Sequence, residues 1–167
     1  MPARILRNCV KRAQSAASVV TARKTTTRVP YSAEQMFDLV ADVIKYPEFL
    51  PWCTALRIVQ DNVQDGGGEL TADMVVGYKV FRERFRSEVT LDKEAKTINA
   101  TYVDGPFRSL ENRWRFVDRP EGGSVIEFEI SFEFKNLFLQ ATAQSVFDKA
   151  FSRMSEAFVV RADDVYG

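Results

Sequence analysis

Histidine is absent from this chain of 167 residues, and only two cysteines occur, Cys9 and Cys53. Metal centres and activated nucleophiles depend heavily on these two residue types, so we expect neither a metal site nor catalytic residues. No apolar run approaches the roughly 20 residues of a membrane-spanning helix. The 23 basic residues balance the 23 acidic ones, so the chain as a whole has no nucleic-acid footprint. These absences give little support to an enzyme.

Aromatic residues are abundant instead, with 13 Phe, 5 Tyr and 2 Trp in a length that fits one domain. Between 136 and 166, apolar residues recur every three or four positions, which predicts one long helix. At ~1.5 Å per residue this helix would be on the order of 40 Å long, so its apolar face needs a cover. The predicted stripe comprises Leu137, Ala141, Gln144, Phe147, Phe151, Met154, Phe158 and Ala162.

The segment before this helix indicates what the cover is. Between 124 and 134, Ile and Phe alternate with Glu and Ser, which is typical of a strand with one apolar and one wet face. Short turns predict antiparallel neighbours at 54–60, 69–76, 80–91, 97–103 and 109–117, after a first strand at 25–29 and a helix capped by Ser32 and Gln35. The predicted fold class is α+β: a curved antiparallel sheet wrapped around a long C-terminal helix, with two short helices after the first strand.

The first 23 residues differ in composition from the rest. They contain basic residues but no acidic one, and Leu6, Val10 and Ala17 lie on one helical stripe. This pattern is typical of a mitochondrial transit peptide and lacks the apolar core of a secretory signal. A disordered basic tail and a wrongly assigned start codon are the alternatives. In each case we expect the domain to comprise residues 24–167.

Pro47 and Pro51 frame an unusually apolar stretch at 46–52. Its side chains Tyr46, Phe49, Leu50 and Trp52 present more apolar surface than one short turn can hide. Tyrosine and tryptophan favour places where one end is apolar and the other wet. The stretch is therefore either a lid at a cavity mouth that opens against a membrane, or a plug in the end of the curved sheet.

Two polar residues are predicted on the inward face of the sheet. Glu83 shares that face with Phe81 and Phe85, where an unpaired carboxylate costs several kcal/mol, so it lies either in a pocket or at the rim. Asn112, next to Trp114, has an amide that can donate to a ligand carbonyl or bond to the neighbouring backbone. Other polar groups that could point inward are Tyr102, Gln144 and Asp148.

Six segments, in order along the chain, resemble one known family. They are YSAEQMF at 31–37, YPEFLPWC at 46–53, FRERF at 81–85, DGPF at 104–107, WRF at 114–116 and ISFEF at 130–134. Together they look like the coenzyme Q-binding START-like family, whose bacterial members are also called ribosome-association toxins and whose wider group includes polyketide cyclases and lipid-transfer domains. The resemblance extends from about residue 25 to 167.

This resemblance implies a helix-grip fold with a deep cavity that binds ubiquinone or its polyprenyl intermediates. The implied function is non-catalytic lipid binding that supports respiration and ubiquinone biosynthesis, with ubiquinone as bound ligand and no required cofactor. The family has no agreed catalytic residues, so none is assigned. The residues expected to line the cavity and its mouth are Tyr46, Phe49, Leu50, Trp52, Phe81, Glu83, Phe85, Tyr102, Asn112, Trp114, Phe128, Phe132, Phe147, Phe151 and Met154.

Two other functions compete with this one. A ribosome-association protein would bind the large ribosomal subunit, and the outward row of Arg82, Arg84 and Arg86 could contact RNA phosphates. A cyclase or hydrolase would need a positioned acid or base, for which Glu83 is the candidate. For the lipid-binding function we expect transient membrane contact, with the chain on the matrix side of the mitochondrial inner membrane if the leader is a transit peptide, and otherwise in the bacterial cytoplasm. The chain could also form a homo-oligomer.

Overall fold

Seven antiparallel strands form one curved sheet in the computed structural model, which describes residues 20–79 and 81–167. The strand order is β1-β7-β6-β5-β4-β3-β2, so strands that follow one another from β2 to β7 are neighbours, and β1 joins the far edge beside β7. The elements are β1 (Thr21–Val29), α1 (Ala33–Ala41), η1 (Val43–Lys45), α2 (Tyr46–Phe49), β2 (Cys53–Gln64), β3 (Gly67–Tyr78), β4 (Phe81–Asp92), β5 (Thr97–Asp104), β6 (Phe107–Asp118), β7 (Ser124–Phe134) and α3 (Leu137–Tyr166).

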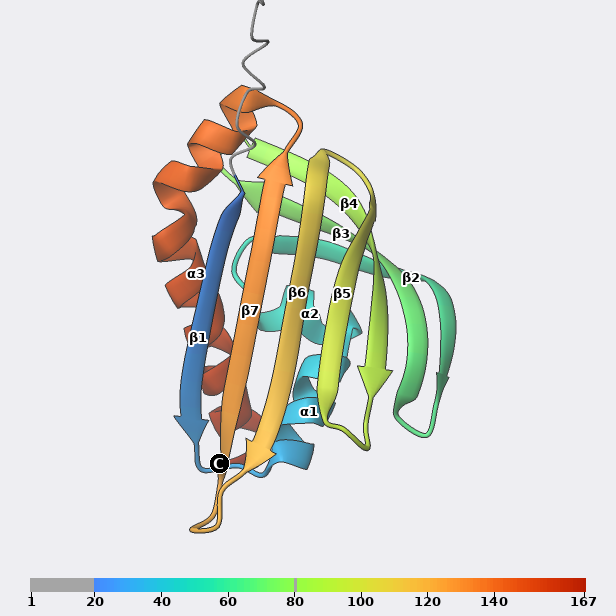
Figure 1. The fold of residues 1–167 in the computed structure, drawn as a ribbon, viewed down its shortest axis with the longest axis vertical. Helices are drawn as coiled ribbons and strands as arrows, with labels where there is room; N and C mark the ends of the chain where they lie inside the picture. The colour runs from blue at the N-terminus through green and yellow to red at the C-terminus, as the bar shows by residue number, and fades with distance from the viewer. Residues whose placement is uncertain (1–19, 80) are drawn as a thin grey trace, which may run out of the picture.

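The 30-residue helix α3 runs along the concave side of the sheet (Figure 1). The short helices α1 and α2 lie on the same side, near the C-terminal end of α3. This arrangement confirms the predicted α+β fold, a curved antiparallel sheet around a long C-terminal helix. Within the described residues, no helix combines the length and the apolarity needed to cross a membrane.

Helix α1 begins at the predicted capping box. The Ser32 hydroxyl accepts a hydrogen bond from the Gln35 backbone N–H at 3.1 Å, and the Gln35 side chain accepts one from the Ser32 N–H at 2.9 Å. The Ala33 N–H donates to the Asp118 carboxylate at 2.7 Å, which ties the helix start to the end of β6. Met36 and Phe37 are fully buried beneath the helix, and the Phe37 ring meets Phe116 edge-on at 6.1 Å. The capped helix therefore closes one end of the curved sheet.

Strand β1 begins earlier than the sequence predicts. Thr21, Ala22 and Arg23, which we had assigned to the leader, pair with β7 opposite Phe132, Ser131 and Ile130. The Thr21 hydroxyl accepts a hydrogen bond from the buried Gln140 side chain at 3.2 Å. Basic and β-branched residues on a solvated edge strand have the same composition as a leader, so composition alone misplaced the boundary. The predicted helical stripe of residues 1–19 lies outside the described residues.

The predicted stripe on α3 is wrong over its first three turns. Leu137, Ala141 and Gln144 are exposed, and the face toward the sheet carries Leu139, Ala143 and Val146 instead. The two patterns merge at Phe147, and Met154, Phe158 and Ala162 face inward as predicted. No charged residue occurs from 137 to 147. Because charges normally mark the solvent side of a helix, their absence left its orientation undetermined.

On the convex face of the sheet, Asp73 of β3 is buried beneath three arginines. Its carboxylate accepts hydrogen bonds from Arg57 at 2.9 Å, Arg84 at 2.5 Å and Arg86 at 2.7 Å. The Asp73 side chain is only 6% exposed, whereas that of Arg57 is 70% exposed. The hydrogen bonds from Arg86, joined by those from Arg57 and Arg84, outweigh the cost of burial and hold the pKa of Asp73 well below its usual value. The cluster ties β2, β3 and β4 together.

The start of β1 can be tested by comparing two truncations. A chain that lacks residues 1–23 loses the Thr21–Gln140 hydrogen bond and the pairing of Thr21 to Arg23, whereas one that lacks residues 1–19 keeps them. Loss of this hydrogen bond should cost roughly 0.5–1.5 kcal/mol. In a chain of this length that corresponds to a thermal midpoint about 1–6 °C lower for the longer truncation. Equal midpoints for the two truncations would contradict the assigned start of β1.

Asp73→Asn should lower the free energy of unfolding by ~1–3 kcal/mol, because charged hydrogen bonds are lost and three guanidinium groups are left without their anion. Since the folded-state pKa is depressed, the Asp73 carboxylate stabilises the fold above its unfolded pKa of about 4, and this contribution disappears as the pH falls further. Urea unfolding should therefore show a steeper acid loss in the wild type than in Asp73→Asn. The exposed Asp164→Asn is the control, and an acid limb of equal slope in all three proteins would refute the role of Asp73.

Candidate functional site

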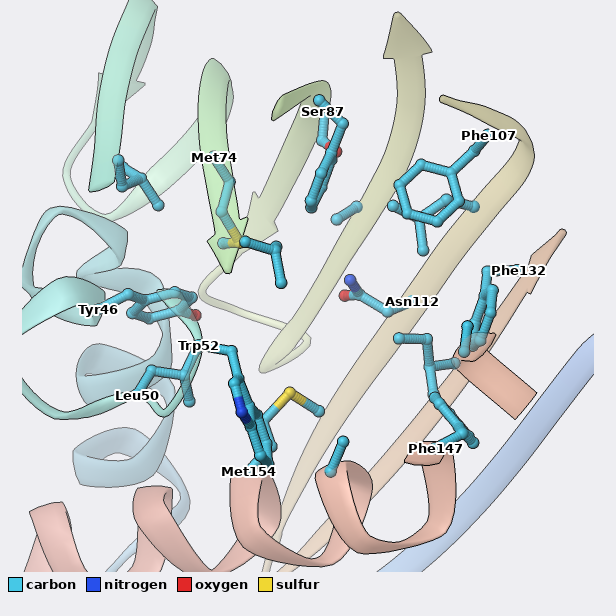
Figure 2. A pocket seen from close by; sticks show the side chains of 18 of the residues that line it. Tyr46, Leu50, Trp52, Met74, Ser87, Phe107, Asn112, Phe132, Phe147 and Met154 are labelled. Atoms are coloured by element: carbon cyan, nitrogen blue, oxygen red, sulfur yellow. The ribbon is translucent and has the colours of Figure 1, made fainter. Parts of the chain in front are cut away.

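The concave face of the sheet and α3 enclose a cavity of about 310 Å³. Its wall draws on strands β2 to β7, on α2 and on the middle of α3, and Figure 2 shows side chains from these elements converging on one space. Within the part of the chain that the structure describes, no lining side chain is charged. The wall is thus almost entirely aromatic and aliphatic.

Most of the residues predicted to form the site do line this cavity. They are Tyr46, Leu50, Trp52, Phe81, Phe85, Asn112, Trp114, Phe128, Phe132, Phe147 and Met154. Strand β3 also contributes to the wall, although none of its residues was predicted to do so: Ala72, Met74, Val76 and Tyr78. Their alternation with Asp73, Val75 and Gly77 is a period-two signal that could have identified them.

Two predicted aromatic residues lie outside the lining. Phe151 is half-buried and stacks on Phe128 with ring centroids 5.6 Å apart, so it supports the wall from behind. Phe49 packs between the rings of Tyr46 and Phe158, and the Arg161 guanidinium lies 5.2 Å from its centroid on the outer side. Both residues belong to the packed layer around the cavity, not to its surface.

The predicted polar residues Glu83 and Tyr102 are also absent from the lining. Glu83 is half-buried between Phe81 and Phe85 on β4 but outside the cavity, as expected for a carboxylate that avoids desolvation. The Tyr102 hydroxyl donates to the Gly105 carbonyl at 2.6 Å, which directs it to the turn between β5 and β6. Gln144 and Asp148 are exposed on the outer face of α3, where Asp148 accepts hydrogen bonds from Arg23.

The stretch 46–52 lies partly in the core and partly at the rim of the cavity, and its opening against a membrane stays a prediction. Tyr46 and Leu50 are 9% and 8% exposed, and the Tyr46 hydroxyl donates to the Val40 carbonyl at 2.5 Å, so these two residues plug the end of the sheet. Burial raises the pKa of Tyr46 far above its usual value, which keeps the hydroxyl protonated. Trp52 is half-buried and meets Tyr78 at 5.9 Å, so its ring borders the cavity near solvent. Half of the stretch is core and Trp52 forms part of the rim.

Asn112 carries the one carboxamide in the described lining, and Figure 2 shows it near the middle of the cavity. It lies on β6 between Ala100 of β5 and Ile130 of β7, and the small Ala100 leaves space beside it. Among the described residues, its side-chain amide has no hydrogen-bond partner, and neither has the Ser87 hydroxyl in the same wall. An amide in this setting offers two donors and an acceptor to whatever fills the cavity.

Other groups offer little chemistry. Burial raises the pKa of the Cys53 thiol to about 11, so the thiol stays protonated at neutral pH and is a poor nucleophile. The described residues hold no group of three or more metal-ligating side chains. The arrangement can take up an apolar molecule and orient a polar group on it through hydrogen bonds to Asn112.

Comparisons with known proteins agree with this geometry. The family model for "Polyketide cyclase / dehydrase and lipid transport" matches residues 29–159. Ribosome association toxin RatA of Escherichia coli (strain K12) is 38% identical over 141 residues, covering 84% of this chain and 86% of that protein. Coenzyme Q-binding protein COQ10 homolog B, mitochondrial, of Xenopus laevis is 34% identical over 141 residues, covering 82% of this chain and 56% of that protein.

Solved structures show the same fold. The solution structure of the 18 kDa protein CC1736 from Caulobacter crescentus has a TM-score of 0.73 at 34% identity and covers 88% of this chain and 99% of its own. The Zhui aromatase/cyclase from Streptomyces sp. R1128 reaches a TM-score of 0.75 at 14% identity, covering 87% and 94%, which shows the fold alone. The chain therefore belongs to the polyketide cyclase/dehydrase and lipid transport family, as a START-like member related to the RatA and COQ10 proteins.

Proposed function

We propose that this protein is a non-catalytic carrier that binds ubiquinone or one of its polyprenyl precursors and supplies it to respiration and ubiquinone biosynthesis. The observation that carries the proposal is the cavity itself, whose described wall is uncharged and holds a single carboxamide without a protein partner. A quinone has the matching chemistry, since its ring carbonyls accept hydrogen bonds and its tail is purely apolar. An uncharged wall supports a binding role over acid–base catalysis, which needs a positioned proton donor or acceptor.

The dimensions of the cavity suit part of such a ligand. A polyprenyl tail gains roughly 0.8 kcal/mol for each CH₂ group that it buries, and it needs no polar partner. The volume of about 310 Å³ lies at the lower end of ordinary ligand pockets. The cavity therefore takes the ring and the first isoprene units, with the ring beside the Asn112 amide. The remainder of a long tail stays outside.

Ribosome association is the second candidate, and the 38% identity to RatA is the observation that favours it. The outward arginines were the feature expected to contact RNA. Arg84 and Arg86 are engaged with Asp73 at 2.5 and 2.7 Å, which leaves Arg82 as the exposed member of that row without such a contact. Three arginines, Arg84, Arg86 and Arg57, surround the single Asp73 carboxylate, so the convex face keeps positive charge that could meet RNA phosphates. We place lipid binding first because of the uncharged cavity.

One comparison separates the two functions. Protein purified under native conditions is extracted with organic solvent, and the extract is analysed by mass spectrometry for ubiquinone and polyprenyl compounds. In parallel, the protein is sedimented with ribosomes at rising salt concentration, since phosphate contacts weaken with salt. Recovered quinone without co-sedimentation supports the carrier. Salt-sensitive co-sedimentation with a lipid-free extract would replace it with the ribosome function.

Asn112→Leu should weaken quinone binding about 2- to 12-fold, the equivalent of one hydrogen bond of ~0.5–1.5 kcal/mol. Because the amide has no hydrogen-bond partner among the described residues, its removal leaves no other polar group without a partner. The free energy of unfolding should therefore stay the same or rise. Affinity for a polyprenyl hydrocarbon of equal tail length should not fall, and Ser87→Ala is the control in the same wall. If quinone and hydrocarbon affinities drop together, Asn112 does not bind the ring.

A larger side chain in the cavity should exclude the ligand without unfolding the protein. Ala150 faces the cavity from α3, whereas Ala141 is exposed on the same helix, so Ala150→Phe and Ala141→Phe place equal bulk on opposite sides. Ala150→Phe should abolish quinone recovery while its thermal midpoint stays close to that of the control, because the new ring fills space instead of displacing packed atoms. Undiminished quinone in both variants would move the binding site elsewhere.

A further inference from the structure

Two large apolar side chains stand almost fully exposed at the start of α3. Leu137 is 86% and Phe138 76% exposed, the highest values among the large apolar residues that the structure describes. Isolated exposed apolar residues need no explanation, but two adjacent ones on the first turn of a helix form a small patch. We refer to these two residues as the Leu137–Phe138 patch.

The patch continues the cavity wall. Phe138, Thr142, Val146 and Ala150 follow one another at intervals of four and therefore share one face of α3, and the last three line the cavity. The Thr142 hydroxyl donates to the Phe138 carbonyl at 2.9 Å, so its polar group is used within the helix. An apolar path thus leads along α3 from the cavity to the exposed Phe138 ring.

The turn between β3 and β4 lies at the same end of the molecule (Figure 1). The ring centroid of Phe81, the first residue of β4, lies 6.1 Å from that of Phe134, which ends β7 shortly before α3 begins. Lys79 in this turn and Lys135 before α3 are exposed and positively charged, and the Lys135 ammonium donates to the Gly105 carbonyl at 3.3 Å. Of the nearby acids, Glu133 is paired with Arg108 at 3.8 Å and Glu83 is half-buried.

The composition of α3 indicates what this surface meets. Residues 137–147 contain no charge, although Ala141, Gln144 and Ser145 are exposed as well. A helix start in water normally gains from acidic residues, because its N-terminal end carries partial positive charge, yet the first turn of α3 has none. An apolar, uncharged helical surface with lysines at its margin is typical of a segment that lies in the interface of a lipid bilayer.

We propose that the Leu137–Phe138 patch inserts into a lipid bilayer and docks the protein with the start of α3 toward the membrane. Two side chains offer far less area than the roughly 800 Å² that each partner of a stable protein interface buries, so a second copy of the chain is not the occupant. The docking places the path along Phe138, Thr142 and Val146 in contact with the bilayer. This inference holds whichever apolar lipid the cavity carries.

The test uses the full chain and neutral phosphatidylcholine vesicles, on which the charge of the basic leader has little effect. Leu137→Ser combined with Phe138→Ser should lower the vesicle partition coefficient at least about tenfold, or ~1.4 kcal/mol. The matched control, Val160→Ser with Val165→Ser, removes side chains that are 49% and 53% exposed near the other end of α3, and it should bind like the wild type. Leu137→Phe with Phe138→Trp keeps the patch apolar and should also retain binding.

Several results would overturn the proposal. They are a wild type that does not bind these vesicles, a serine variant that binds as tightly as the wild type, and an equal loss in the control. A serine variant that changes from dimer to monomer in sedimentation, with unchanged vesicle binding, would identify the patch as a self-association surface. Thermal midpoints of all variants should agree, since the substituted side chains are exposed. Quinone recovery is scored separately, so a failed docking surface and a failed carrier function give different outcomes.

Discussion

The cavity exists because α3 is anchored to the sheet at both ends and carries several small side chains between the anchors. Near its start, the Gln140 side chain accepts a hydrogen bond from the Phe134 N–H at 2.7 Å and donates to Thr21, which joins the helix to β7 and β1. Near its end, Phe158 and Ala162 are buried, and the Tyr166 hydroxyl donates to the Gln35 carbonyl at 3.0 Å. Between these anchors Phe147 and Phe151 pack on β7, whereas the small Ala143, Val146 and Ala150 leave the cavity open toward the rest of the sheet.

The convex face of the sheet carries the ionic interactions that stabilise it, and the concave face forms the cavity. Alternation along β3 sends Ala72 and Met74 to the cavity and Asp73 to the opposite face, where its arginines tie three strands together. Ionic interactions therefore hold the strands together on the outside, and the inner face needs no charge. A wall without charges leaves no ionised group to be desolvated inside the cavity.

Much of the fold and of the cavity wall could be predicted from the sequence, and each wrong prediction has its own physical cause. Strands were found because their period of two is strict and glycine-rich turns separate them, as at 124–134. The orientation predicted for the first turns of α3 was wrong because residues 137–147 contain no charge to mark the solvent side. Alternation left Glu83 either in a pocket or at the rim, and it cannot decide between them, because Phe81 and Phe85 on both sides line the cavity while Glu83 does not. Tyr102 was misplaced by a local contact, since its hydroxyl donates to the Gly105 carbonyl three residues further along the chain.

Trp52 shows how the needs of the backbone and of the cavity diverge. It has a φ of 66°, in the left-handed region where residues other than glycine pay about 1–2 kcal/mol, and its carbonyl accepts a hydrogen bond from Gly77 at 2.9 Å. Glycine would relieve the backbone there but would remove an indole ring from the rim. Selection for thermal stability alone would therefore favour glycine at this position, whereas selection for ligand retention would keep tryptophan. Position 52 is thus a place where improving the fold and preserving the site require opposite substitutions.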